Sequence, residues 1–151
     1  MSRPAKTVHD SYTSQVHLIN QSHLNGFHRL FGGQLLMWMD EVAGITARRH
    51  AGHIVTTACI EKLDFRAPAY ANDTLVLTGH IVQVGRTSMT VMVHAYVEAL
   101  NGERKMINEA HFVMVAIDEN ERPVEVPDII IDTDKKRAQL ENAEYLRKTL
   151  R

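Results

Sequence analysis

The stretch of residues 25–50, NGFHRLFGGQLLMWMDEVAGITARRH, most restricts the fold that this chain can adopt. It predicts a short loop, a glycine pair and one long helix with apolar residues on all of its sides. Such a helix is normally buried, so the rest of the chain has to enclose it. Asp40 lies in its middle, and no residue three or four positions away is basic. Asp40 therefore either reaches solvent or a distant arginine, or is an acid or base held at an active site.

The chain that follows this helix alternates between apolar and polar residues, as antiparallel strands do. Asn101-Gly102 predicts a hairpin, Gly79 is a candidate bulge, and Pro68 favours either an edge position or a bend for the strand that precedes it. Because the strands follow one another without intervening helices, we expect an α+β fold in which an antiparallel sheet curls around one central helix. The expected strands cover residues 14–19, 54–64, 75–84, 89–98 and 106–117.

The length of 151 residues fits one domain, residues 1–151, with a flexible segment over residues 1–12 and a C-terminal helix over residues 132–151. Cys59 is the single cysteine, so an internal disulfide and a thiolate metal cage are excluded. The chain shows neither the apolar core of a signal peptide nor a run that could span a membrane. With a net charge of -1, we expect a cytoplasmic protein without a nucleic-acid or membrane partner.

Five motifs in a fixed order carry a resemblance to a known family. They are Asn25 with LFGG at 30–33, WMDE at 38–41, LDFRAP at 63–68, VGRTSM at 84–89, and FVMVAI at 112–117 with RP at 122–123 and VP at 126–127. Together they resemble the acyl-CoA thioesterase (acyl-CoA hydrolase) family, whose members have the hotdog fold. The resemblance covers most of the chain, from about residue 25 to the expected C-terminal helix.

The resemblance implies an enzyme of fatty acid metabolism that hydrolyses acyl-CoA to a free fatty acid and CoA. It assigns Asp40 the part of general base or nucleophile, and makes Asn25 a second catalytic residue that orients water or substrate. Gly33 lies at a helix N-terminus, where its N–H can meet a developing oxyanion. The resemblance further implies a site shared across a dimer interface, commonly within a hexamer built as three dimers. CoA is part of the substrate, and no metal or other cofactor is expected.

Candidate CoA-binding residues lie in two of the family motifs. Arg66 and Arg86 fall at strand ends, and Thr87 and Ser88 can donate hydrogen bonds from the second of these turns. Each arginine taken alone is a common kind of solvated surface charge. Thr57 matches a polar family position at the start of its strand, where we expect it to support the site.

His28 departs from the family pattern, which often has glycine at this place. It lies beside the presumed site, so it could narrow the acyl pocket or shift the loop that carries Asn25. His28 could also imitate the catalytic histidine of hotdog acyl-thioester dehydratases, although Asn25 and the Phe-Gly-Gly motif argue against that function. A non-catalytic acyl-CoA-binding module is a further alternative, which Asp40 argues against. His50 and His53 have the spacing of zinc ligands, but a glycine that ends the helix lies between them.

Overall fold

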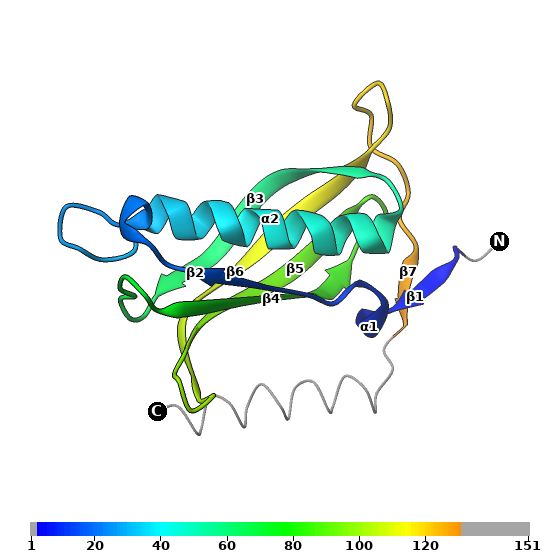
Figure 1. The fold of residues 1–151 in the computed structure, drawn as a ribbon. Helices are drawn as coiled ribbons and strands as arrows, with labels where there is room; N and C mark the ends of the chain where they lie inside the picture. Colours follow the sequence, from blue (N-terminus) through cyan, green and yellow to red (C-terminus); the bar gives the residue numbers. More distant parts are fainter. Residues whose placement is uncertain (1–2, 131–151) are drawn as a thin grey trace.

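One face of an antiparallel sheet is covered by a single long helix in the computed structural model, which describes residues 3–130 (Figure 1). The strands lie in the order β2-β4-β5-β6-β3, and every neighbouring pair is antiparallel. This confirms the α+β class and the five strands that periodicity predicted. Their bounds are Thr13–Leu18 for β2, Ile54–Phe65 for β3, Thr74–Val84 for β4, Ser88–Glu98 for β5 and Arg104–Ile117 for β6.

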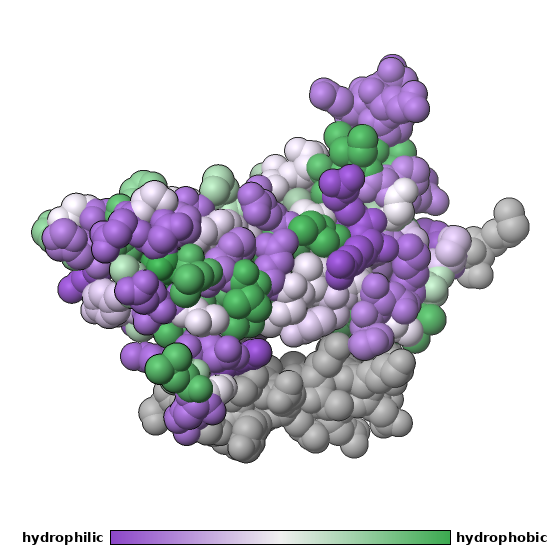
Figure 2. Space-filling model, viewed as in Figure 1, coloured by the Kyte–Doolittle hydropathy of each residue, from purple (hydrophilic) through white to green (hydrophobic). Residues whose placement is uncertain are grey.

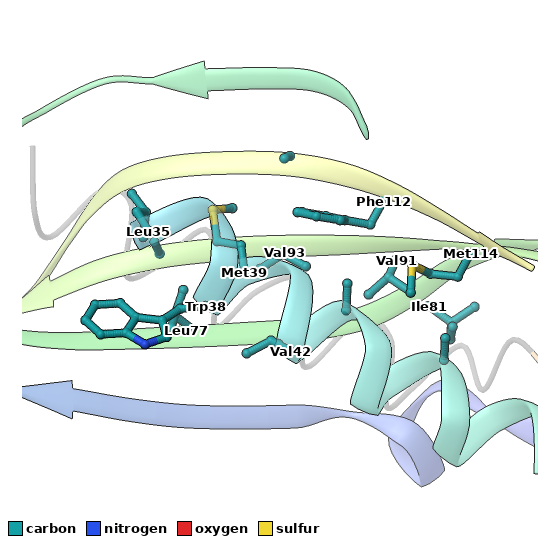
Figure 3. Close-up of a cluster of buried hydrophobic side chains, with 14 of the residues drawn as sticks. Leu35, Trp38, Met39, Val42, Leu77, Ile81, Val91, Val93, Phe112 and Met114 are labelled. Atoms are coloured by element: carbon teal, nitrogen blue, oxygen red, sulfur yellow. The ribbon is translucent and has the colours of Figure 1, made fainter. Parts of the chain in front are cut away.

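The long helix, α2 (Gly32–Ala51), packs its apolar side against the sheet and forms the centre of the core. It ends at Gly52, whose φ of 68° is a left-handed conformation that glycine adopts readily. Arg48 and Arg49 in its last turn interact favourably with the helix dipole. In Figure 3 the helix contributes Leu35, Trp38, Met39 and Val42 to the core, and the strands contribute Leu77, Ile81, Val91, Val93, Phe112 and Met114.

Gly79 in β4 lets the helix approach the sheet closely. A Cβ atom at this position would lie 2.8 Å from both Val42 Cγ1 and Thr46 Oγ1 of α2. The interpretation of Gly79 as a bulge is wrong, because it pairs in register with both neighbouring strands and the irregularity in β4 comes after Ile81. The glycine is required by the close packing of helix and sheet instead.

The face of α2 that is turned away from the sheet is open within this chain, and it adjoins the edge strand β3. Met37 on this face is 51% exposed, and in β3 Ile54 is 61% and Phe65 is 54% exposed. Figure 2 shows hydrophobic residues among hydrophilic ones on the side of the molecule that carries α2. The strand order confirms the edge position that Pro68 favours. Enclosure on nearly all sides is not reached in a single chain, because the sheet curls under one side of the helix only.

The N-terminal segment differs from the expectation of a flexible stretch over residues 1–12. It contains β1 (Ala5–Thr7), which pairs in parallel with β7 (Asp128–Ile130), and α1 (Val8–Ser11). A reciprocal pair of hydrogen bonds between Thr7 and Asp10 caps α1, and Val8 is buried. The pairing and this cap hold a polar segment in place. A short 3-10 helix, η1 (Gln21–His23), follows β2.

The expected C-terminal helix over residues 132–151 lies outside the described residues. Within residues 3–130, no helix is both long and apolar enough to cross a membrane.

Candidate active site

Asp40 lies in the middle of α2 and is held by a residue of β3. The hydroxyl of Thr57 donates a 2.7 Å hydrogen bond to Asp40 Oδ1. A bulge between Thr57 and Cys59 interrupts the pairing of β3 with β6, at the place where the Thr57 side chain meets the helix. Asp40 is half-buried, and within residues 3–130 no Lys, Arg or His forms an ion pair with it. Its Oδ2 accepts no hydrogen bond within that range, so one carboxylate oxygen is fixed and the other is available.

Asn25 lies in the loop before α2, and the backbone fixes the orientation of its side chain. Its Oδ1 accepts hydrogen bonds from the backbone N–H of Phe27 at 2.8 Å and of Arg29 at 3.2 Å. Its own N–H donates to the Arg29 carbonyl oxygen at 2.7 Å. Because the amide oxygen is engaged, the Nδ2 group points away from these donors with two N–H bonds to offer. Asn25 is therefore a turn residue whose Nδ2 group could donate to a bound molecule.

His28 occupies a backbone conformation that favours glycine. Its φ is 62°, in the left-handed region, which destabilises a non-glycine residue by about 1–2 kcal/mol. Its N–H nonetheless donates to the Asn25 carbonyl oxygen at 3.1 Å, and its side chain is exposed. The departure from the family glycine thus strains the loop locally, while the turn around Asn25 keeps its hydrogen bonds.

The N-terminus of α2 presents free backbone donors beside this loop. Phe31 is the residue that precedes the helix, and its side chain provides no cap. The first N–H groups of a helix have no partner within it, and the helix dipole favours negative charge there. A Cβ atom on Gly33 would lie 2.5 Å from the Phe31 ring, and one on Gly32 would lie 3.7 Å from the Phe65 ring. A side chain at position 33 would thus have to displace the Phe31 ring, which is 55% exposed.

The catalytic candidates fall into two groups within one chain. Asn25 and Gly33 lie at the start of α2, whereas Asp40 and Thr57 lie further along it. Gly33 and Asp40 are seven residues apart, which is about 10 Å along the helix axis. A carbonyl carbon has to lie within about 3 Å of both the nucleophile or its water and the oxyanion donors. A single chain does not bring the two groups to one carbonyl.

Arg66, a candidate for CoA binding, is paired with two carboxylates. Its Nε donates to Asp64 Oδ2 at 2.9 Å, and its Nη2 donates to Glu109 Oε1 at 2.8 Å. The hydrogen bond to Asp64, with the charge of Glu109, raises the pKa of Arg66 above its usual value against a smaller opposing effect of desolvation. A phosphate would have to share this guanidinium with the carboxylates or displace them.

Arg86 lies at the opposite end of the sheet from Arg66. The N–H of Arg66 donates to the Ile107 carbonyl oxygen, whereas the carbonyl oxygen of Thr87 accepts from the N–H of Ala116. Ile107 and Ala116 are nine residues apart on β6, which is about 30 Å of extended strand. Arg86 itself pairs with Glu125 at 2.8 Å and its side chain is 81% exposed. Within a single chain, Arg66 therefore does not lie in one group with Arg86, Thr87 and Ser88, and CoA binding by these residues stays a prediction.

The far end of α2 carries an open cleft of about 720 Å³ that contains none of the predicted site residues. His53 lies in its lining, whereas His50 is fully buried and its Nε2 lies 2.7 Å from the Pro127 carbonyl oxygen. Burial lowers the pKa of His50 below its usual value. The two histidines do not converge, and within residues 3–130 no three His, Cys, Asp or Glu side chains form a group that could hold a metal. The zinc spacing in the sequence thus has no counterpart in the fold.

Asn108 is a buried polar residue that the sequence analysis did not single out. Its side chain is 0% exposed, and neither amide atom has a hydrogen-bond partner among the described residues. Leaving one such group unpaired destabilises a protein by about 1–3 kcal/mol. The signal in the sequence was a polar residue that interrupts the nearly continuous apolar strand at its start.

The model of the thioesterase superfamily matches residues 27–101. An uncharacterized acyl-CoA thioester hydrolase of Bacillus subtilis is 34% identical over 113 residues, which cover 74% of this chain and 66% of the relative. The chain spans a smaller share, 19–38%, of the mammalian acyl-CoA thioesterases that it also matches.

Two solved structures resemble the whole fold. A hexameric acyl-CoA thioesterase without ligand superposes with a TM-score of 0.84 at 35% identity, over 97% of this chain and 94% of that one. An acyl-CoA hydrolase from Staphylococcus aureus in complex with butyryl-CoA and CoA superposes with a TM-score of 0.82 at 27% identity, over 95% and 93% of the chains. That hydrolase was also solved with an Asn, an Asp and a Thr each replaced by Ala. The intervals between those positions, 15 and 17 residues, equal those between Asn25, Asp40 and Thr57.

Proposed function

The chain belongs to the hotdog-fold acyl-CoA thioesterase family, and on this premise we propose that it hydrolyses acyl-CoA to a free fatty acid and CoA. The observation that carries the proposal is the 2.7 Å hydrogen bond from Thr57 to Asp40, which joins the two elements of the candidate site. The equal spacing of Asn25, Asp40 and Thr57 to the replaced residues of the Staphylococcus aureus hydrolase supports these three as the working groups.

Asp40 supplies the base or the nucleophile. The Thr57 hydroxyl engages Oδ1 and fixes the carboxylate, so Oδ2 faces the reacting group. As a base, Oδ2 takes a proton from water while the water oxygen bonds to the thioester carbon, and the C–S bond then breaks to release CoA thiolate. As a nucleophile, Oδ2 bonds to that carbon and expels the thiolate, and water hydrolyses the resulting anhydride. Both routes pass through an oxyanion on the former carbonyl oxygen.

Asn25 and Gly33 supply the donors for that oxyanion. The Nδ2 group of Asn25 is left to donate because its oxygen is held by two backbone N–H groups. The N–H of Gly33 lies at the start of α2, where the helix dipole adds a favourable potential for negative charge. Donors aimed in advance at a developing charge give large rate enhancements in acyl transfer.

A dimer is the smallest unit that assembles this site. Gly33 and Asp40 are about 10 Å apart along one helix, so the two groups have to come from different copies to meet one carbonyl. If two α2 helices lie antiparallel about a two-fold axis, Gly33 of one faces Asp40 of the other when the axis passes beside residues 36 and 37. Met37 is exposed there, and the exposed edge strand β3 adjoins it. Hexameric relatives support further assembly into three dimers.

The same antiparallel arrangement places the end of the sheet that carries Arg86 in one copy near the end of the sheet that carries Arg66 in the other copy. We therefore keep Arg66, Arg86, Thr87 and Ser88 as CoA-binding residues, now drawn from two subunits. The proposed chemistry uses proton transfer and the N–H donors of Asn25 and Gly33, so it needs no metal or redox cofactor. Cytosolic localisation stays a prediction, supported by the exposed single cysteine, Cys59.

The test is release of free thiol from acyl-CoAs of two to sixteen carbons by the wild type and by Asp40→Asn. We expect the wild type to turn over and the variant to lose about 10³-fold in kcat while still binding CoA, because general acid–base catalysis contributes on that scale. Glu41→Gln, which removes an exposed carboxylate from the adjacent position, is the matched control and should keep wild-type activity. Stoichiometric binding without thiol release from any substrate would reject hydrolysis in favour of a binding module.

A further inference from the structure

Asn108 is a buried polar residue that the proposed mechanism does not use. Its amide is 0% exposed, and both Oδ1 and Nδ2 lack a hydrogen-bond partner among residues 3–130. Thr46 gives the contrast, because its equally buried hydroxyl donates to the Val42 carbonyl oxygen at 2.8 Å. Buried polar groups in folded proteins are nearly always paired. An amide with both ends unpaired therefore calls for a partner from outside these residues.

The register of the sheet turns Asn108 toward the helix. Asn108 pairs with Ala95 of β5, and side chains of an antiparallel pair share one face of a sheet. Ala95 belongs to the core that packs against α2, so Asn108 lies on the same inner face. Ala110, two residues further along β6, is also on this face and is buried. The amide is thus flanked by two small side chains.

Asn108 also lies beside the start of α2, where the proposed oxyanion donors are. Its pairing partner on the other side is Phe65 of β3, about 5 Å away as cross-strand neighbours are. The Phe65 ring lies 3.7 Å from the position of a Cβ atom on Gly32, the first residue of α2. Phe65 is 54% exposed, so the fully buried amide of Asn108 is paired with a residue that reaches the surface.

We propose that Asn108 is a specificity-determining residue that binds a hydroxyl group on the acyl chain of the substrate. A hydroxyl can donate to Oδ1 and accept from Nδ2, so it satisfies both ends of the amide at once. An unsubstituted chain satisfies neither. Because Phe65 pairs with Asn108 and its ring lies beside the first residue of α2, we place the hydroxyl on one of the first few carbons after the thioester. This inference rests on the proposed function, and it names 3-hydroxyacyl-CoA as the substrate class.

The test compares kcat/KM for 3-hydroxybutyryl-CoA and butyryl-CoA, which have equal chain length, by thiol release. We expect the wild type to prefer the hydroxylated substrate at least about tenfold, because a site built to bond a hydroxyl rejects the analogue that lacks it. Asn108→Leu replaces the amide with an apolar group of similar size and should remove this preference. It should also unfold at the same or a higher temperature, because no buried polar group stays unpaired. Thr46→Val, a matched change at a paired buried polar residue, should keep the wild-type ratio.

Equal rates on the two substrates by the wild type, or an unchanged ratio in Asn108→Leu, would overturn the inference and leave a bound water as the partner of the amide. If Asn108→Leu does not fold, Asn108→Thr is used in its place. Its ratio of kcat/KM for the hydroxylated substrate to that for butyryl-CoA should then be greater than one but smaller than that of the wild type. If the proposed function itself is wrong, the result is different, because no thiol would be released from either substrate or from any other acyl-CoA.

Discussion

The two faces of α2 differ in the kind of property that their residues control. On the side toward the sheet, Met39 and Val42 are 0% exposed and Gly79 leaves no room for even one more carbon. On the other side, Met37 is half-exposed, and Asp40 is held at one oxygen by Thr57 and is available at the other. Adjacent residues of one helix thus belong to the core and to the candidate site. The closed face fixes the position of the helix. The open face can carry groups that interact with a substrate or with a second copy of the chain.

Met39→Ala should have the largest effect on the closed face. Removing a fully buried methionine side chain is expected to lower the free energy of unfolding by about 2–5 kcal/mol, as measured by urea denaturation. The kcat of the folded fraction should stay near that of the wild type. Met37→Ala is the matched control on the open face. A loss of stability that depends on protein concentration in this variant would show that Met37 lies in a subunit interface.

Gly79→Ala tests the close approach of helix and sheet. The added Cβ atom would lie 2.8 Å from two α2 side chains, so we expect destabilisation of about 1–3 kcal/mol. Thermal unfolding measures it, with Gly26→Ala as the control because an added Cβ atom there meets no atom within 4 Å. An unchanged melting temperature in Gly79→Ala would mean that helix and sheet are further apart than described.

Thr57→Val tests the open face of α2, where we expect a loss of activity without a loss of stability. The change keeps the shape of the side chain and removes the hydroxyl that fixes Asp40, so kcat should fall about 10- to 100-fold, on the scale of a hydrogen bond to a charged group. The free energy of unfolding should change little, because Thr57 is exposed in the chain. If the free energy of unfolding fell by as many kcal/mol as the loss in kcat corresponds to, the assignment of Thr57 to the site would be contradicted.

His50, fully buried at the end of α2, should give the smallest effect, a dependence of stability on pH. Burial lowers the pKa of His50 in the folded state, so the unfolded chain binds the proton more readily. The stability contributed by neutral His50 is therefore complete above pH 6.5 and is lost as pH falls through the lower pKa of the folded state. His50→Gln should flatten the fall of the melting temperature between pH 7 and pH 5, and an identical profile would exclude His50 as its source.

The residues of the candidate site could be proposed from the sequence where a local pattern or a family motif includes them. Asp40 stood out because a carboxylate interrupts an apolar helix, and Asn25 and Gly33 because the family motifs include them. The contact between Asp40 and Thr57 joins residues 17 positions apart in the sequence, and no periodicity in the chain encodes it. The separation of Arg66 from Arg86 was missed for the same reason, because residues at two strand ends are near or far according to the direction of each strand.

The sequence by itself determined the five strands of the main sheet and their order along the chain, the long helix with Asp40, the hairpin at Asn101-Gly102 and the family motifs. Backbone sterics and the spacing of apolar residues act over a few neighbours, so the chain displays them directly. Only the tertiary structure decided that Gly79 makes room for the helix, that one chain leaves a face of α2 open, and that Asn108 points inward. The last depends on an irregularity between β5 and β6, beside Ala95. A shift of one residue in register exchanges the two faces of a strand, and that shift is set by the whole sheet.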